Sequence, residues 1–268
     1  MSEPNPGSYT PSDLRGGAAD DAAAMSTPQT VTGIFFEPGR TFESLRVRPR
    51  FLAVGILSII IFMAFYLLYM TRIGYENIIN AGIEMQAQKS EMSDEQKTAM
   101  RDIQLKPFVK AIRYASPPIG FVIVFAAGAA IYLLGVMAMG KQISYKQALA
   151  VWTYSSFPPL LLAMLANILI LFLRPPDPGD YAGVTRGLGG LVHANPGAFM
   201  ASDANPMLIT ALSSLDLFAF YGLFLAALGL RKVGRLSSSS AWGVVIALWL
   251  LGVIARIAVS TFTHAPVG

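Results

Sequence analysis

Two charged residues stand inside otherwise apolar stretches of the chain. They are Asp216 in "ALSSLDLFAF" (211–220) and Arg256 in "VIARIAVS" (253–260). Charged side chains are costly in a membrane and often mark functional sites. Each lies about 14–15 residues, or roughly 21–22 Å of helix, from the short segment that joins the two stretches. Because helices joined by a short turn usually pack as neighbours, the two charges are predicted to lie at the same depth.

Three interpretations of Asp216 and Arg256 follow. We favour a structural ion pair that holds two membrane helices together and reduces the cost of two isolated charges. The second is a working site, in which the pair relays protons or balances a substrate's charge. In the third there is no pairing, and Arg256 extends its side chain to the nearby outer surface of the membrane.

A second candidate is the Pro158–Pro159 pair in "YSSFPPLLL". Two prolines remove backbone donors and predict a helix kink. Broken helices can line transport sites. We favour a static kink in which Ser155, Ser156 and Asn167 satisfy the freed carbonyls or bind neighbouring helices, because no second broken span is evident at a matching position.

Motifs for enzymatic chemistry are absent from the sequence. There is no nucleophile elbow, zinc-protease motif, phosphate-binding loop or dinucleotide fingerprint. The chain has no Cys, and its two His, His193 and His264, lie outside the apolar stretches. We therefore predict no enzymatic activity, no cofactor and no metal site. The net charge of +4 does not require a nucleic-acid partner.

The composition identifies the elements that position these residues. The chain is 54% hydrophobic and 13% charged, whereas soluble domains carry roughly 25% charged residues. Each of five apolar runs can cross a hydrocarbon core of about 30 Å and must be helical there, because no water satisfies the backbone. The predicted fold is an all-α transmembrane bundle of five helices. The predicted spans are 51–70, 119–140, 148–173, 207–230 and 241–262.

The part of the chain before the first span consists of two segments. Residues 1–30 contain few large apolar side chains and are predicted to be disordered. Residues 31–50 combine aromatic and basic residues, which suits an interfacial helix at the membrane surface. An ordinary basic flank of the first span fits equally well. The side chains predicted to contact the membrane surface are Phe35, Phe36, Arg40, Phe42, Arg46, Arg48 and Arg50.

Basic residues between the spans predict the orientation. They gather before the first span, at Lys141 and Lys146 after the second, and at Arg231, Lys232 and Arg235 after the fourth. Five crossings place these three segments on one side, which is predicted to be cytoplasmic. The N-terminus is then cytoplasmic, and the short tail 263–268 lies outside.

Two long connections separate the spans. In 71–118, Ser93 and Gln96 predict a helix that begins with a capping box, Pro107 predicts a stop, and "SPP" (116–118) predicts the start of the second span. This connection could bind a partner, although we favour a solvated connector. The 174–206 connection is turn-rich and could either dip toward the membrane or be slack chain.

Three stretches together resemble the Ypt-interacting-protein (Yip) family, especially its prokaryotic members. They are "GIFFEPGRTFESL", "GKQISYKQALAVWTYSSFPPLLL" and "LSSLDLFAFYGLFLAALGLRKVGRLSSSSAWGVVIALW". The resemblance covers roughly residues 31–262. It implies a five-helix membrane domain over 51–262, a cytoplasmic N-terminus and no enzymatic activity. It also implies a prokaryotic cytoplasmic (inner) membrane, and a GTPase partner only by distant analogy with eukaryotic relatives.

The leading hypothesis is a membrane-organising or scaffold protein that acts through helix–helix and protein–protein contacts in the bilayer. Its expected partners are lipid, other membrane proteins or further copies of the same chain. The alternative is a small transporter or channel component that uses the kinked third span and the Asp216/Arg256 pair.

Overall fold

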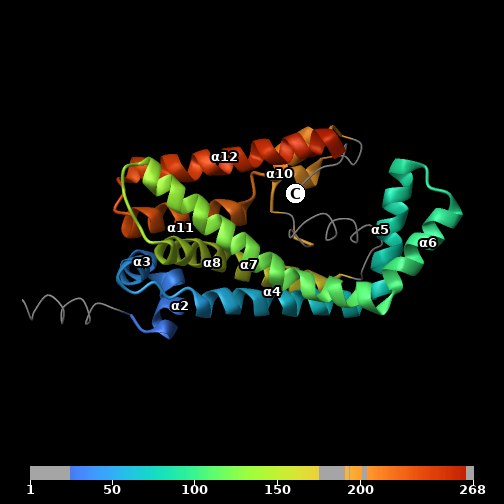
Figure 1. Ribbon diagram of the computed structural model, residues 1–268, viewed down its shortest axis with the longest axis horizontal. Coiled ribbons are helices and arrows are strands. Elements are labelled where there is room, and N and C mark those ends of the chain that lie inside the picture. The colour runs from blue at the N-terminus through green and yellow to red at the C-terminus, as the bar shows by residue number, and fades with distance from the viewer. Residues whose placement is uncertain (1–24, 175–190, 193, 201–203, 264–268) are drawn as a thin grey trace, which may run out of the picture.

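The computed structural model describes residues 25–174, 191–192, 194–200 and 204–263, and within them the regular structure is entirely helical (Figure 1). The all-α prediction is therefore confirmed. The helices are α2 Thr27–Phe36, α3 Pro38–Val47, α4 Leu52–Ile73, α5 Tyr75–Ser90, α6 Asp94–Leu105, α7 Pro107–Ala138, α8 Tyr145–Leu173, η1 Pro196–Phe199, α10 Pro206–Ser213, α11 Leu217–Val233 and α12 Ser238–Thr263.

Four helices are long and apolar enough to cross a membrane, namely α4, α7, α8 and α12. A fifth crossing exists if α10 and α11 act as one span, and these two helices meet at an angle of 49°. The prediction of one helix over 207–230 is thus wrong. The chain leaves the helical path between Ser213 and Leu217 and starts a new helix there.

Helix α8 forms the centre of the bundle and packs against α4, α7 and α11. Its buried side chains include Val151, Tyr154 and Phe157. The approach to α7 is close because Gly128 lies directly against the indole of Trp152. A methyl group on Gly128 would lie 2.1 Å from that ring, so only glycine allows this packing.

The segment before the first span folds into two helices at one end of the bundle. Ser26 starts α2 with a capping box in which its hydroxyl oxygen accepts the N–H of Gln29. Helix α3 follows after Glu37 and packs against α11 and α8. Residues 25–30 are thus ordered, which corrects the predicted boundary of the disordered tail, and residues 1–24 lie outside the described residues.

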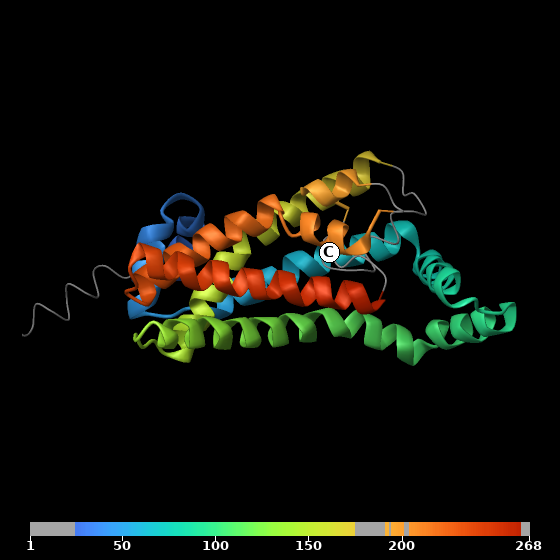
Figure 2. The same ribbon diagram turned by 90° about the horizontal axis from the view of Figure 1, so that it is seen from above.

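Helices α5 and α6 form a hairpin that extends beyond the other end of the bundle in both views (Figures 1 and 2). The predicted capping box is confirmed, because the hydroxyl oxygen of Ser93 accepts the N–H of Gln96. Ion pairs join the two helices, with Lys97 Nζ 3.1 Å from Glu84 Oε2. The hairpin is therefore a charged, helical extension of the bundle.

Helix α7 begins at Pro107 and passes through Pro117 and Pro118, so the predicted start at 116–118 is wrong. Proline at 117 deprives the carbonyl of Arg113 of its helical donor. That carbonyl oxygen instead accepts the hydroxyls of Ser116, at 3.1 Å, and Tyr66, at 3.3 Å. The helix continues because these side chains replace the missing hydrogen bond.

Candidate functional site

Asp216 lies at the start of α11, in the bend between α10 and α11. Its Oδ1 accepts the backbone N–H groups of Phe218, at 2.9 Å, and Ala219, at 3.1 Å. The amide of Asn195 donates to its other oxygen at 3.5 Å. Asp216 is thus the N-cap of α11, and its charge faces the positive end of the helix dipole.

Arg256 lies half-buried on α12. Among the described residues, the ion pairs do not join Arg256 to Asp216. The helix start alone accounts for an acid at position 216, because aspartate is one of the preferred N-cap residues. An ion pair between the two in a bilayer stays a prediction. The signal that sequence reasoning missed is the polar run "SSLD", which is typical of a helix stop followed by a cap.

The bend before Asp216 is held by packing and hydrogen bonds. The hydroxyl of Ser214 donates to the carbonyl of Thr210 at 2.9 Å. Gly197 in η1 lies so close to α10 that a methyl group there would approach Ser213 Oγ to 2.2 Å. The backbone N–H of Leu217 donates to the carbonyl of Ala194 at 3.1 Å. The segment around η1 therefore supports the broken span. The α10–α11 pair is thus an interrupted stretch in addition to the proline pair of α8, while the prediction that no second broken span lies at a matching position stays a prediction.

The Pro158–Pro159 pair lies within α8, which is helical without interruption from Tyr145 to Leu173. Both prolines are buried. A methyl group on Gly222 of α11 would lie 3.5 Å from Pro159 Cγ, so α11 passes close to the proline pair. The predicted kink stays a prediction, while the structure assigns this part of α8 to the contact with α11.

Asn167 is the most informative polar residue of α8, because its side chain is fully buried. Its amide nitrogen donates to the carbonyl of Ala163 at 2.8 Å. Its oxygen accepts the backbone N–H groups of Leu191 and of Val192, the latter at 2.9 Å. Asn167 was predicted to bind carbonyls or neighbouring helices. It also holds the connection that follows α8 against that helix, six residues before the helix ends.

The residues predicted to contact the membrane surface divide into two groups. Phe42 is fully buried in the core, so its assignment as a surface contact is wrong. Phe35 packs edge-on against Phe157 of α8 with ring centroids 5.7 Å apart. Phe36 is 85% exposed. Phe42 is buried because α3 packs against α8 and α11. The sequence pattern of one short helix does not reveal which helices it will pack against.

The arginines of this segment also differ in role. Arg50 donates to the carbonyl of Met25 and to the hydroxyl of Thr27, both at 3.2 Å, and so holds the start of α2. Arg46 is half-buried and Arg48 is exposed. Contact of Phe36 and of the arginines with lipid stays a prediction.

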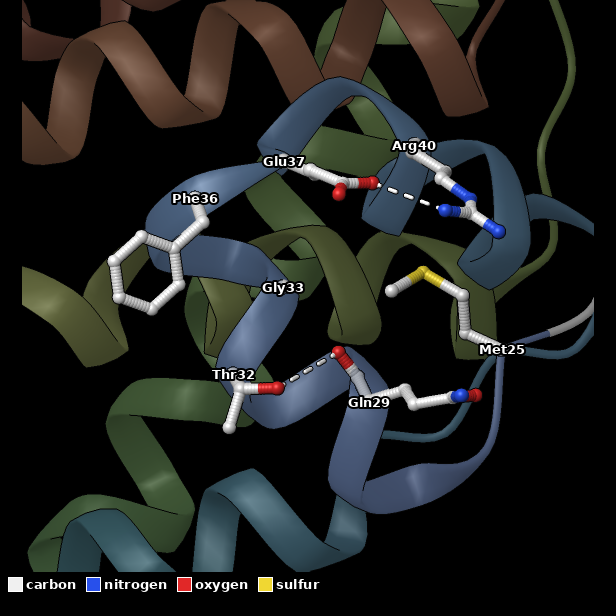
Figure 3. Close-up of a pocket in the computed structure, with 7 residues that line it drawn as sticks. All are labelled: Met25, Gln29, Thr32, Gly33, Phe36, Glu37 and Arg40. Carbon is white, nitrogen blue, oxygen red and sulfur yellow. Dashed lines mark hydrogen bonds and ion pairs between the residues drawn. The ribbon is translucent and has the colours of Figure 1, made fainter.

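A cavity of about 270 Å³ lies beside α2 and the start of α3 (Figure 3). Figure 3 shows the ion pair between Arg40 and Glu37, at 3.2 Å, on one side and the ring of Phe36 on the other. The charge of Arg40 is thus partly balanced within the protein. The cavity combines the polar side chains of Gln29, Thr32 and the ion pair with the apolar Met25 and one exposed aromatic ring at its edge.

Comparison with known proteins identifies the family. The Yip1 domain family model matches residues 32–259 of the chain. No curated protein and no solved structure shows a significant match. The matched range begins in the middle of α2 and ends near the end of α12, so it includes the second half of α2, all of α3 and almost all of the membrane helices described above. The chain therefore belongs to the Yip1 domain family of membrane proteins.

Proposed function

We propose that this Yip-family protein is a non-enzymatic membrane organiser that acts through lateral helix–helix contacts in the bilayer. The observation that supports the proposal is one stripe along α12. Ala241, Val245, Gly252 and Val259 lie within about 40° of one another around a helix with 100° per residue. The first two are 1% exposed, whereas Val259 is 49% exposed.

The stripe changes from covered to uncovered at Gly252. Near its start α12 touches α7, and a methyl group on Gly135 of α7 would lie 2.5 Å from Val244 Cγ1. A methyl group on Gly252 would meet nothing within 4 Å. The face of α12 that packs against the bundle at one end therefore continues as an open apolar face at the other.

Among the described residues no side chain lies over Gly252, and the same holds for Gly120 and Gly243, so packing within the bundle does not account for a glycine there. Glycine destabilises a helix interior by about 1 kcal/mol relative to alanine. Gly128, Gly135 and Gly229 each lie directly under a neighbouring side chain, which explains them. Small residues on a membrane helix allow another helix to approach closely. Gly252 therefore fits a contact with a helix from another membrane protein or from a second copy of this chain.

The orientation that we propose places α2 and α3 on the cytoplasmic side of a prokaryotic inner membrane. The positions of the three basic segments of the sequence support this orientation. They are α3, the α7–α8 turn and the α11–α12 turn. These lie at one end of the bundle, and the last turn of α12 lies toward the other (Figure 1). A clustering of Lys and Arg on one side is typical of the cytoplasmic face. A GTPase partner at this face rests on family analogy alone.

The proposal is tested by site-specific photo-crosslinking in native membranes. The chain has no Cys, so a benzophenone maleimide can be attached to a single introduced thiol. Val259→Cys places it on the stripe, and Ile254→Cys, 62% exposed in the structure, places it on the opposite side of α12. We expect a discrete adduct from Val259→Cys and at most a faint one from Ile254→Cys.

A second variant identifies the contact. Gly252→Leu, combined with Val259→Cys, places a large side chain at a position where a methyl group meets nothing within 4 Å, and we expect it to reduce the adduct at least fivefold. Equal adducts from both faces indicate random collision and contradict the proposal. An adduct that is unaffected by Gly252→Leu contradicts it too.

The alternative, a small transporter that uses α8 and the Asp216/Arg256 pair, has one feature in its favour, which is the interrupted α10–α11 span. Transport requires water at Asp216. A polar thiol reagent should then label Asp216→Cys, with exposed Thr98→Cys as the positive control. We expect Asp216→Cys to be protected, and rapid labelling would favour the transporter.

A further inference from the structure

Three basic segments that are far apart in the sequence meet around one pocket. Arg46 comes from the last turn of α3, Lys141 from the turn after α7 and Arg235 from the turn after α11. The pocket has a volume of about 510 Å³, and none of the side chains that line it is acidic. Gln142 and Gln147 add polar groups. The pocket is thus suited to an anion.

The walls of the pocket are fixed by hydrogen bonds. The side-chain amide of Gln147 donates to the carbonyl of Arg46 at 2.7 Å and so binds the end of α3 to the start of α8. Gly140 has φ +70°, and the backbone N–H of Lys141 donates to the carbonyl of Val136 at 3.2 Å. The three cations therefore extend from a rigid frame rather than from free tails.

Arg235 has an unusual backbone. Its φ of +52° lies in the left-handed region that favours glycine, and helices often end with a glycine there. The glycine of this turn is instead Gly234, where a methyl group would lie 2.7 Å from the carbonyl oxygen of Leu230. An arginine held in a strained position beside a pocket points to a role for its side chain.

Within the described part of the chain, no acidic side chain pairs with the cations of the pocket, which are Arg46, Lys141 and Arg235. The neighbouring Lys232, in contrast, binds Glu43. Three uncompensated positive charges around one space attract an anion, and arginine in particular matches the geometry of phosphate.

We propose that this pocket binds the phosphate of an anionic phospholipid headgroup. It lies where α7, α8 and α11 end or begin, which is the level of the headgroups for a bundle that crosses the membrane. Val47, which is 43% exposed, also lines the pocket beside the buried Val233, so one exposed apolar side chain adjoins the cations. A lipid presents the same combination of an anion and an adjoining apolar part. Inorganic phosphate shares the anion but not the apolar part.

A simpler role for the cations is to stabilise helix ends. Arg46, Lys141 and Arg235 each follow or lie in the last turn of a helix, where a positive charge is favourable. That role affects the stability of the protein and not its affinity for a ligand. The experiment therefore measures both quantities for the intact chain.

The experiment is calorimetric titration of the purified protein in a neutral detergent. The probes are dihexanoyl phosphatidylglycerol, zwitterionic dihexanoyl phosphatidylcholine and inorganic phosphate. We expect phosphatidylglycerol to bind at least tenfold more tightly than either of the other two. Equal binding of inorganic phosphate would contradict a lipid site, and equal binding of phosphatidylcholine would contradict an anion site.

Two variants separate binding from folding. Arg235→Gly removes the charge and relaxes the backbone, so we expect an unchanged or higher melting temperature together with at least tenfold weaker binding. Lys141→Gln should weaken binding similarly. Lys146→Gln is the matched control, since Lys146 is an exposed cation in the first turn of α8, five residues after Lys141 and outside the pocket. Undiminished binding by Arg235→Gly, or an equal loss with Lys146→Gln, would overturn the proposal.

Discussion

The carboxylate of Asp216 accepts the backbone N–H of Phe218 at 2.9 Å, so the acid begins a new helix inside the fourth membrane stretch. An acid in the middle of an unbroken span would need an external partner. An acid at the start of a helix already has a partner, because the first backbone N–H groups of the helix have no acceptor within the helix. This relationship explains both the charge and the 49° bend.

The cap makes a prediction that separates it from an ion pair with Arg256. Asp216→Asn keeps an oxygen that accepts the backbone N–H groups, whereas Asp216→Ala removes it. We expect Ala to lower the free energy of unfolding by about 1 kcal/mol and Asn to change it little. Denaturant unfolding in detergent measures both. If Asn is as damaging as Ala, the negative charge is what matters, and pairing with Arg256 becomes the better explanation.

The N-terminal helices provide a second prediction, based on two phenylalanines of contrasting exposure. Phe42→Ala removes a fully buried ring from the core shared by α3, α8 and α11. We expect a loss of about 3–5 kcal/mol in the free energy of unfolding. Phe36→Ala, at a position that is 85% exposed, should leave stability unchanged. Similar small effects at both positions would mean that α3 is not docked on the bundle.

A third prediction concerns the close contact of α7 with α8. Gly128→Ala places a methyl group against the indole of Trp152 and should cost about 1–3 kcal/mol through overpacking. Gly120→Ala is the control on the same helix, because a methyl group there meets nothing within 4 Å. Thermal unfolding should show a lower melting temperature only for Gly128→Ala. Equal effects of the two variants would disprove the close packing.

The buried amide of α8 provides a fourth prediction. Asn167→Leu removes the acceptor for the N–H groups of Leu191 and Val192 and should cost about 1–3 kcal/mol, because it leaves buried donors without partners. Leu165→Ala, at a position of α8 that is 54% exposed, is the control on the same helix. Limited proteolysis should show faster cleavage near residue 191 in Asn167→Leu alone. Unchanged protection in that variant would contradict the role of Asn167.

Much of the fold could be predicted from composition and periodicity. Long apolar runs identify α4, α8 and α12 to within a few residues, because only a helix satisfies its own backbone in lipid. The capping boxes at Ser93 and Ser144 depend on neighbouring residues alone. Only the first of these two was predicted.

Most of the errors arise from contact between distant segments, although the break before Asp216 also had a local signal in "SSLD". The helix α7 passes Pro117 because Tyr66, on another helix, supplies a hydroxyl to the freed carbonyl. Phe42 is buried because α8 and α11 cover it. The break at Asp216 rests on η1 and Asn195, from a connection that carries little periodic signal. A single sequence does not show which distant segments meet.

The central claim is that the interrupted α10–α11 pair crosses the membrane once, so that the chain crosses five times. Single cysteines in this Cys-free chain test it through a membrane-impermeant maleimide in sealed vesicles of known orientation. Gln142→Cys and Ser239→Cys should label from one side, and Thr98→Cys and Thr263→Cys from the other. Labelling of Ser239→Cys from the same side as Thr98→Cys would show that α10–α11 turns back, and would contradict the five-crossing bundle.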